Sequence, residues 1–142
     1  MAVCAAVALC GCGAGDCRSY MSEIRGREWS RPVTILLPNA DTTGLCDMRI
    51  ALRHNGRAGK SEVAVSVRTE TPDSLFTEEM FAIRLADDGR SRSAQHEASA
   101  LYRTRVRLSR EGEYRITITP AQPVRGVSAV GVELSPAAES KE

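Results

Sequence analysis

The residues best suited to covalent chemistry are cysteines close to the N-terminus. An uncharged apolar run at residues 2–9 ends in Leu9-Cys10-Gly11-Cys12. This order is typical of the export signal of a bacterial lipoprotein, in which a peptidase cleaves after a small residue and the next cysteine carries the lipid. We therefore expect residues 1–11 to be a signal peptide and Cys12 to be the lipidated residue of a tether at residues 12–30. The chain would then lie in the cell envelope, lipid-anchored to a bacterial membrane, at the outer membrane or facing the periplasm.

Two alternatives to a cleaved signal stay open on the sequence alone. The apolar run has no positively charged segment before it, and it is far shorter than the ~20 residues that span a bilayer. One alternative is a cytosolic chain with a disordered, cysteine-rich start or a frayed first strand, and the other is an uncleaved anchor.

The remaining cysteines, Cys17 and Cys46, admit two interpretations. In an oxidising compartment they could pair and tie the tether to the domain. Alternatively, Cys46 packs as a small apolar side chain. No Cys-x-x-Cys spacing is present, and His54 and His96 are the only histidines, so we expect no metal site.

Catalytic motifs are missing from the sequence. Hydrolysis needs a nucleophile with a base, or two convergent carboxylates, and neither Gly-x-Ser-x-Gly nor His-Glu-x-x-His occurs. The segment Gly56-Arg57-Ala58-Gly59-Lys60-Ser61 ends like a phosphate-binding loop, but its glycines are too close together and strand-like alternation follows it. We interpret it as a hairpin turn. We expect no catalytic residue, no enzymatic activity, no cofactor and no small-molecule substrate.

The strongest candidate for an interaction surface is a row of basic side chains. Arg103, Arg105 and Arg107 alternate with Tyr102, Thr104, Val106 and Leu108. On a regular strand this spacing places all three guanidinium groups on one face, where they could meet phosphate, lipid A or an acidic partner. The alternative is a solvated face, with the arginines paired to Glu62, Glu70 or Glu113.

Trp29 is a second candidate contact, because it is the only tryptophan and lies near the tether. It would either meet a partner near the membrane or pack across the end of the domain.

Composition limits the kinds of partner. The chain has 19 basic and 18 acidic residues among 142, a formal net charge of +1. Nucleic-acid binders neutralise phosphates with an excess of basic side chains, so this balance argues against that class. The length suits one domain with its own core.

Apolar residues recur with a period of two along most of the chain, which is typical of strands with one buried face. Glycine-containing turns at residues 55–56, 88–89 and 111–112 separate these segments. We predict an all-β fold, a single-domain antiparallel β-sandwich of about seven to eight strands at residues 31–135, followed by a disordered tail at residues 136–142. The predicted strands centre on residues 33–37, 48–52, 63–67, 102–108, 114–118 and 130–134.

Two stretches fit the pattern less well. Residues 74–86 fit a strand with Phe81, Ile83 and Leu85 inward, or a short helix capped by Ser74. We favour the strand, because a helix would interrupt an all-β pattern. Residues 87–99 lack periodicity, and we interpret them as a long loop.

The order of features resembles the GldH family, lipoproteins of gliding motility in the Bacteroidetes. The resemblance rests on the lipoprotein signal, Tyr20, Trp29 and four segments: Met48-Arg49-Ile50-Ala51-Leu52-Arg53-His54, Leu85-Ala86-Asp87-Asp88-Gly89, Glu111-Gly112-Glu113-Tyr114-Arg115-Ile116-Thr117-Ile118 and Gly126-Val127-Ser128-Ala129-Val130-Gly131-Val132-Glu133-Leu134. It implies a non-enzymatic, membrane-anchored accessory subunit of a motility or secretion apparatus, whose partners are other envelope proteins. The alternative is a small β-sandwich module that binds a ligand such as a glycan.

Overall fold

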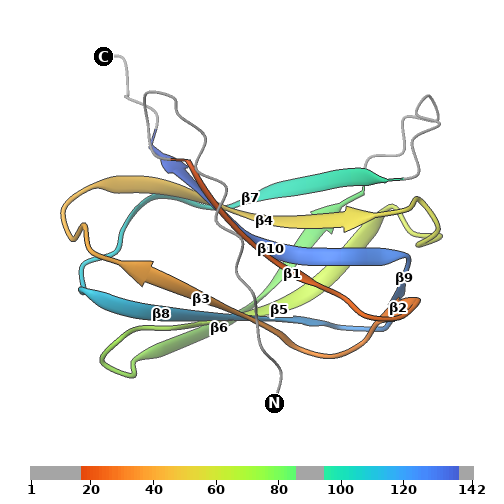
Figure 1. Ribbon diagram of the computed structural model, residues 1–142, viewed down its shortest axis with the longest axis horizontal. Helices are drawn as coiled ribbons and strands as arrows, with labels where there is room; N and C mark the ends of the chain where they lie inside the picture. The colour runs from red at the N-terminus through yellow and green to blue at the C-terminus, as the bar shows by residue number, and fades with distance from the viewer. Residues whose placement is uncertain (1–16, 86–94, 138–142) are drawn as a thin grey trace.

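The computed structural model describes residues 17–85 and 95–137, and within them the chain forms ten β-strands (Figure 1). In chain order they are β1 (Arg18–Glu23), β2 (Glu28–Trp29), β3 (Val33–Asn39), β4 (Leu45–His54), β5 (Glu62–Glu70), β6 (Phe76–Arg84), β7 (His96–Arg107), β8 (Gly112–Pro120), β9 (Val124–Arg125) and β10 (Val127–Pro136). In those two stretches we find no helix with the length and hydropathy needed to cross a membrane.

Eight of these strands form the two layers of a sandwich (Figure 1). One antiparallel sheet has the order β1-β10-β4-β7 and the other has the order β3-β8-β5-β6, while β2 and β9 make a short ribbon. The edge strands of the two sheets meet, because β1 contacts β3 and β6 contacts β7. The prediction of an all-β, single-domain antiparallel sandwich is confirmed.

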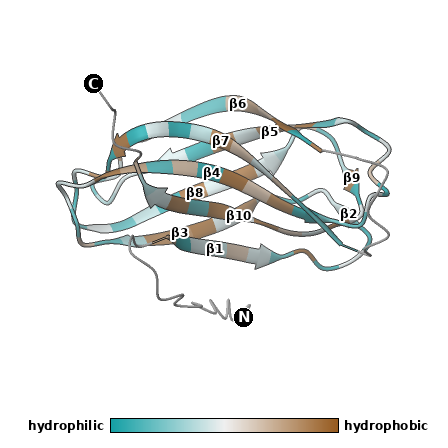
Figure 2. Ribbon diagram, turned by 90° about the horizontal axis from the view of Figure 1, so that it is seen from above, coloured by the Kyte–Doolittle hydropathy of each residue, from teal (hydrophilic) through white to brown (hydrophobic). Residues whose placement is uncertain are grey.

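The core follows directly from the period-two pattern. In β3, Val33, Ile35 and Leu37 are buried while the residues between them are exposed. The same alternation in the other strands brings a second set to the interior from both sheets: Ile50, Leu52, Val63, Val65, Val67, Ile83, Ile116, Ile118, Val130, Val132 and Leu134. Figure 2 shows the hydrophobic positions recurring along these strands. Burying each such side chain stabilises the fold by roughly 1.5–3 kcal/mol, so the alternation itself specifies which faces meet.

The prediction of a tether at residues 12–30 is wrong for the part of that range that the structure describes. Residues 18–23 form β1, an edge strand whose register on β10 runs from Arg18↔Leu134 to Glu23↔Ala129, and residues 28–29 form β2. Tyr20 and Ile24 pack against the core. These few apolar side chains, with the backbone bonds that β10 supplies, are enough to add a strand, so the sandwich begins at residue 18 rather than at residue 31.

The ambiguous segment at residues 74–86 contains a strand from Phe76 to Arg84, as the all-β pattern favours. Ile83 and Leu85 are buried and Phe81 packs partly against the core, whereas Ser74 has a φ of 67° within a turn instead of capping a helix. The long loop expected at residues 87–99 is wrong in its last part, because β7 already begins at His96.

The remaining terminal and loop predictions fall mostly beyond the described part of the chain. The signal peptide at residues 1–11, the lipidated Cys12 and the loop residues 87–94 lie outside the described residues. Of the predicted disordered tail, Pro136 belongs to β10, and residues 138–142 lie outside the described part.

Candidate interaction surface

The arginine row of β7 is not a regular stripe. The pairing of β7 with β4 shifts register twice, between Cys46 and Met48 and between Met48 and Arg49. At the first shift Arg105 has a φ of 51°, and its backbone N–H donates to Oδ1 of Asp47 at 2.9 Å. Such bulges break the two-residue alternation, and Thr104, which the pattern places inward, is exposed. The prediction that all three arginines share one face is therefore wrong.

Arg103 is held by the opposite sheet. Its guanidinium forms an ion pair with Glu79 of β6 and lies 4.9 Å from the centroid of the Tyr102 ring. The Tyr102 hydroxyl donates to the same Glu79 oxygen, Oε1, at 2.5 Å. Burial raises the pKa of Tyr102 to about 12, and its contact with the Glu79 carboxylate adds to the shift. Arg103 thus links the two layers through an ion pair, as in the solvated-face interpretation, although its partner is none of the three glutamates named there.

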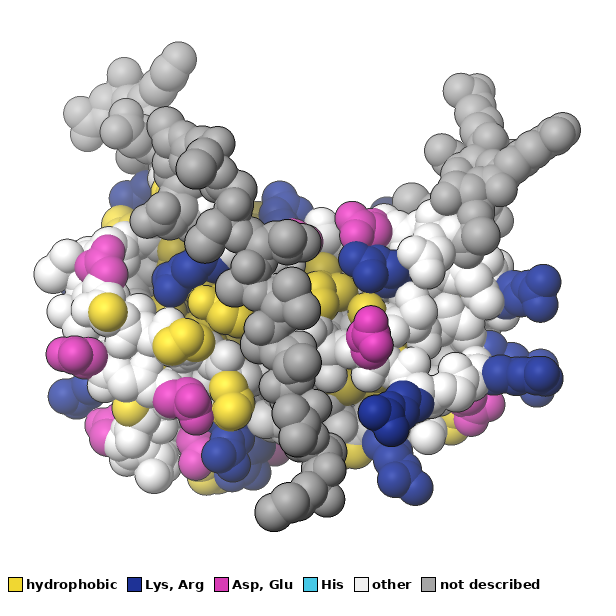
Figure 3. Space-filling model, in the orientation of Figure 1, with side chains coloured by type: hydrophobic (Ala, Val, Ile, Leu, Met, Phe, Trp, Pro, Cys, Tyr) yellow, Lys and Arg dark blue, Asp and Glu magenta, His cyan; other side chains and the backbone are white. Residues whose placement is uncertain are grey.

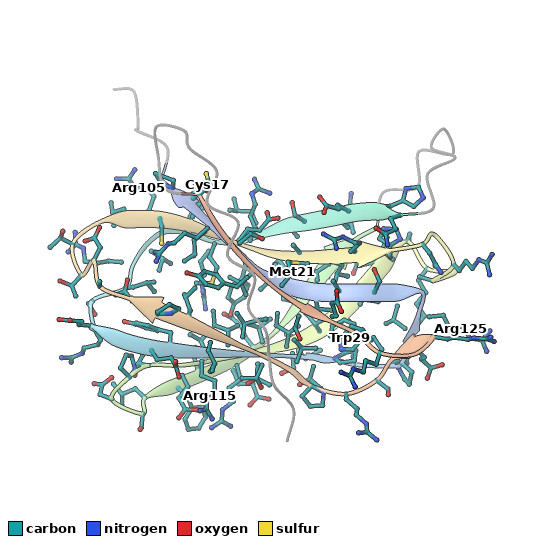
Figure 4. All side chains as sticks on the ribbon, in the orientation of Figure 1. Cys17, Met21, Trp29, Arg105, Arg115 and Arg125 are labelled. Atoms are coloured by element: carbon teal, nitrogen blue, oxygen red, sulfur yellow. The ribbon has the colours of Figure 1, made fainter. Side chains whose placement is uncertain are left out.

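Arg105 and Arg107 are exposed and lie at a defined end of the sandwich. Register places the start of β1, the end of β10, the start of β4 and the end of β7 side by side, through Arg18↔Leu134, Pro136↔Cys46 and Leu45↔Arg107. Figure 4 shows Cys17 and Arg105 at this same end, while Trp29 and Arg125 lie at the other. The described chain therefore begins at the same end of the sandwich as two exposed arginines, at the opposite edge of their sheet.

Trp29 belongs to the core. Its side chain is only 1% exposed, and its Nε1 donates to the backbone oxygen of Arg31 at 2.8 Å. It sits in the β2–β9 ribbon opposite Val124, which closes one end of the sandwich. The interpretation that it packs across the end of the domain is confirmed, and Trp29 is not available as a partner contact.

The two described cysteines are free thiols. Strand β10 lies between them, since Arg18, next to Cys17, is opposite Leu134, while Cys46 is opposite Pro136 on the other side. Strands two apart in a sheet are separated by roughly 9.5 Å, beyond the ~4.4–6.8 Å between Cα atoms that a disulfide bridges. Cys46 packs against the core, and burial raises the pKa of its thiol. The structure therefore supports the interpretation that Cys46 packs as a small apolar side chain, and not a disulfide between Cys17 and Cys46.

The two histidines meet at the end of the sandwich opposite Cys17. His54 and His96 are paired across β4 and β7, and their rings stack with centroids 5.4 Å apart. His54 is 4% exposed, and its Nδ1 accepts a hydrogen bond from Gly56 N at 3.2 Å. An open hollow of about 330 Å³ adjoins His54, Lys60 and Leu85. Within the described stretches, no three His, Cys, Asp or Glu side chains gather as metal ligands.

Surface charge is mixed. Figure 3 shows basic and acidic side chains interspersed on the face that carries β1 and β10. Three further ion pairs among the described residues lie at exposed positions: Arg53–Glu97, Arg68–Glu78 and Arg110–Asp73. Exposed ion pairs contribute about 0–1 kcal/mol each to the stability of the fold. They make the surface polar, and they do not indicate a ligand-binding site.

Comparison with known proteins adds no assignment. No protein-family model, no curated protein and no solved structure matches the chain.

Proposed function

We propose that the chain is a lipid-anchored lipoprotein of a bacterial cell envelope, similar to GldH, whose β-sandwich acts as a non-enzymatic accessory subunit. Its partners are other envelope proteins of a gliding-motility or associated protein-secretion apparatus. The proposal rests on the lipoprotein pattern at residues 9–12, on the resemblance to GldH in the order of motifs, and on the geometry at one end of the sandwich.

The observation that carries the proposal is the position of β1. Arg18, its first residue, follows Cys12 by six residues, so even a fully extended connection spans at most about 22 Å. A lipid on Cys12 would hold this end of the sandwich, and not the end closed by Trp29, close to the membrane.

The side chains at that end suit a membrane surface. Arg105 and Arg107 are exposed there, and Arg18 is the first residue of β1, at the opposite edge of the same sheet. Guanidinium groups bind phosphate oxygens with fixed geometry, and a basic residue near an anionic surface contributes about 1 kcal/mol. These arginines would orient the domain on phosphate-bearing headgroups and leave the rest of the sandwich open to protein partners.

Membrane fractionation tests the anchor. In native cells we expect the wild-type protein in the membrane fraction and a Cys12→Ser variant in the soluble fraction. Cys10→Ser is the matched control, because it removes a neighbouring cysteine that bulky Leu9 precedes, and it should remain membrane-bound. Equal fractionation of wild type and Cys12→Ser would overturn the proposal.

The accessory role has a test of its own. Cross-linking in native membranes, followed by identification of the linked proteins, should recover envelope proteins of a secretion or motility apparatus. Recovery of the wild-type protein without such partners, in membranes where the anchor is established, would overturn the role and leave the anchor standing.

A further inference from the structure

The four edge strands of the sandwich differ in how they are protected. An edge strand exposes a row of backbone N–H and C=O groups that invites pairing with another chain, and proteins block it with proline, bulges, charge or short length. Strand β1 has six residues, β3 contains Pro38, which lacks an N–H, and β7 carries two register shifts with three arginines. Each of these three edges has a recognisable block.

Strand β6 carries charged residues, Glu78, Glu79 and Arg84, but it has no proline, no register shift and no short length to block pairing. It has nine residues, and its register on β5 runs without interruption from Glu70↔Phe76 to Glu62↔Arg84. It contains no proline, and no strand of residues 17–85 and 95–137 pairs with it on the side away from β5. Figure 1 shows β6 at the margin of its sheet. It is the longest regular edge among the described strands.

Hydrogen bonds at the two ends of the β5–β6 ladder show which groups are directed outward. Leu85 N donates to Ser61 O at 2.9 Å, and Thr71 N donates to Leu75 O at 2.8 Å. In an antiparallel ladder bonded positions alternate, so the odd-numbered residues of β6 bond to β5. The even-numbered residues direct their N–H and C=O groups away from β5: Phe76, Glu78, Met80, Ala82 and Arg84.

The same even-numbered residues carry the exposed side chains. Met80 is 63% exposed and Phe76 is 57% exposed, although both are large and apolar. The guanidinium of Arg68 covers one part of the Phe76 ring, 4.0 Å from its centroid. Met80, in the middle of β6, therefore presents an apolar side chain and two available backbone groups at one position.

We propose that β6 pairs with β6 of a second copy of this chain, in an antiparallel register that places Met80 opposite the same residue of the other copy. Outward-directed groups must meet outward-directed groups, so even positions pair with even positions. Centring the pair on Met80 uses the whole strand, with Phe76 opposite Arg84 and Glu78 opposite Ala82. The two four-stranded sheets would join into one eight-stranded sheet about a two-fold axis.

Charge complementarity favours a second copy as the occupant. Within β6 the acidic Glu78 lies on one side of Met80 and the basic Arg84 lies on the other. A two-fold axis through Met80 brings Arg84 of one copy diagonal to Glu78 of the other, within reach of long side chains, and beside the Phe76 ring. On the outer face no like charges stand directly opposite each other.

Charge substitution at the two-fold position tests the pairing. Sedimentation equilibrium would be run on the full chain in reducing buffer, carrying Cys12→Ser so that no lipid drives association. We expect the wild-type sequence to form dimers, and Met80→Lys and Met80→Glu each to raise the dimer dissociation constant at least about tenfold, because each places two like charges in contact. An equimolar mixture of the two variants should restore the dimer, since an ammonium group then faces a carboxylate across the two-fold axis.

Two further variants separate pairing from folding. Leu36→Lys changes an apolar side chain that is 46% exposed on β3, at the opposite edge of the same sheet, and should leave the dimer intact. Met80→Pro removes an N–H that points away from β5, so it should abolish the dimer while the thermal unfolding of the monomer stays cooperative. A wild-type chain that is monomeric at concentrations up to about 100 µM would overturn the proposal, as would dimers that Met80→Lys leaves unchanged.

Discussion

The Tyr102 hydroxyl on β7 donates a hydrogen bond of 2.5 Å to Oε1 of Glu79 on β6, and so joins the edge strands of the two sheets. Arg103, the neighbour of Tyr102, forms an ion pair with the same carboxylate. The Phe81 ring, also on β6, meets the Tyr102 ring edge-on with centroids 5.1 Å apart. One side of the sandwich is therefore closed by a polar contact with an aromatic pair beside it.

Removing this hydroxyl should change stability in a pH-dependent way. At neutral pH we expect Tyr102→Phe to lower the free energy of unfolding by about 1 kcal/mol, because Glu79 loses one donor. Since the folded-state pKa of Tyr102 is raised from 10.0 to about 12, the hydroxyl's contribution is complete below pH ~10 and is lost as the pH rises through about 12. Urea unfolding of both proteins across this interval should show the difference shrinking. A difference in unfolding free energy that stays constant across this pH interval would contradict the hydrogen bond assigned between Tyr102 and Glu79.

Asn39 should tolerate substitution poorly. It is 5% exposed, and its Nδ2 donates to the backbone oxygens of Leu108 and Arg110 at 2.9 and 2.8 Å. Asn39→Ala leaves two carbonyls without this donor, so we expect the free energy of unfolding, measured by chemical denaturation, to fall by roughly 1–3 kcal/mol. Thr34→Ala, on the exposed face of the same strand, should change the free energy of unfolding little. Equal stabilities of the two variants would show that the amide does not hold the β7–β8 connection.

Gly131 should be required for the attachment of β1. A Cβ atom at this position would lie 2.0 Å from the backbone oxygen of Tyr20 and 2.8 Å from the Cα of Met21. Backbone cannot yield as a flexible side chain can, so Gly131→Ala should cost about 1–3 kcal/mol and displace β1. Hydrogen exchange should become faster in Arg18–Glu23 than in β4. Ser135→Ala, further along β10, is the control, and unchanged protection of β1 in Gly131→Ala would contradict the prediction.

The three arginines of β7 should separate into two kinds. Arg103→Gln breaks an exposed ion pair between the sheets, so we expect up to about 1 kcal/mol less stability and unchanged binding to anionic vesicles. The double variant Arg105→Gln with Arg107→Gln should bind vesicles roughly tenfold more weakly. Vesicle flotation and urea unfolding measure the two effects. Binding that survives the double variant would remove the role of this end at the membrane.

Much of the fold is predictable because one physical signal dominates it. Burial of alternate side chains identifies six strands by their centres, for example Val33 to Leu37 in β3 and Val63 to Val67 in β5. Strand β1 gives little of this signal, since Tyr20 and Met21 are its only large apolar residues and its order depends on hydrogen bonds to β10, which lies more than a hundred residues further along the chain. Local pattern carries no information on such a partner.

The candidate site is less predictable for the same reason. Alternation places Arg103, Arg105 and Arg107 together, but the bulge at Arg105 depends on its bond to Asp47 of another strand. Glu79 and Asn39 give no local signal of their roles, because their partners lie 23 or more positions away in the chain. The packing role of Trp29 is predictable, since a single tryptophan in a small domain contributes most when buried.

The most direct test of the proposed function is the mass of the N-terminal peptide of the protein purified from native membranes. We predict a peptide that begins at Cys12 and carries the added mass of a diacylglycerol and an acyl chain. An unmodified N-terminus on protein from the soluble fraction would contradict the lipid anchor, and with it the membrane orientation inferred for Arg105 and Arg107.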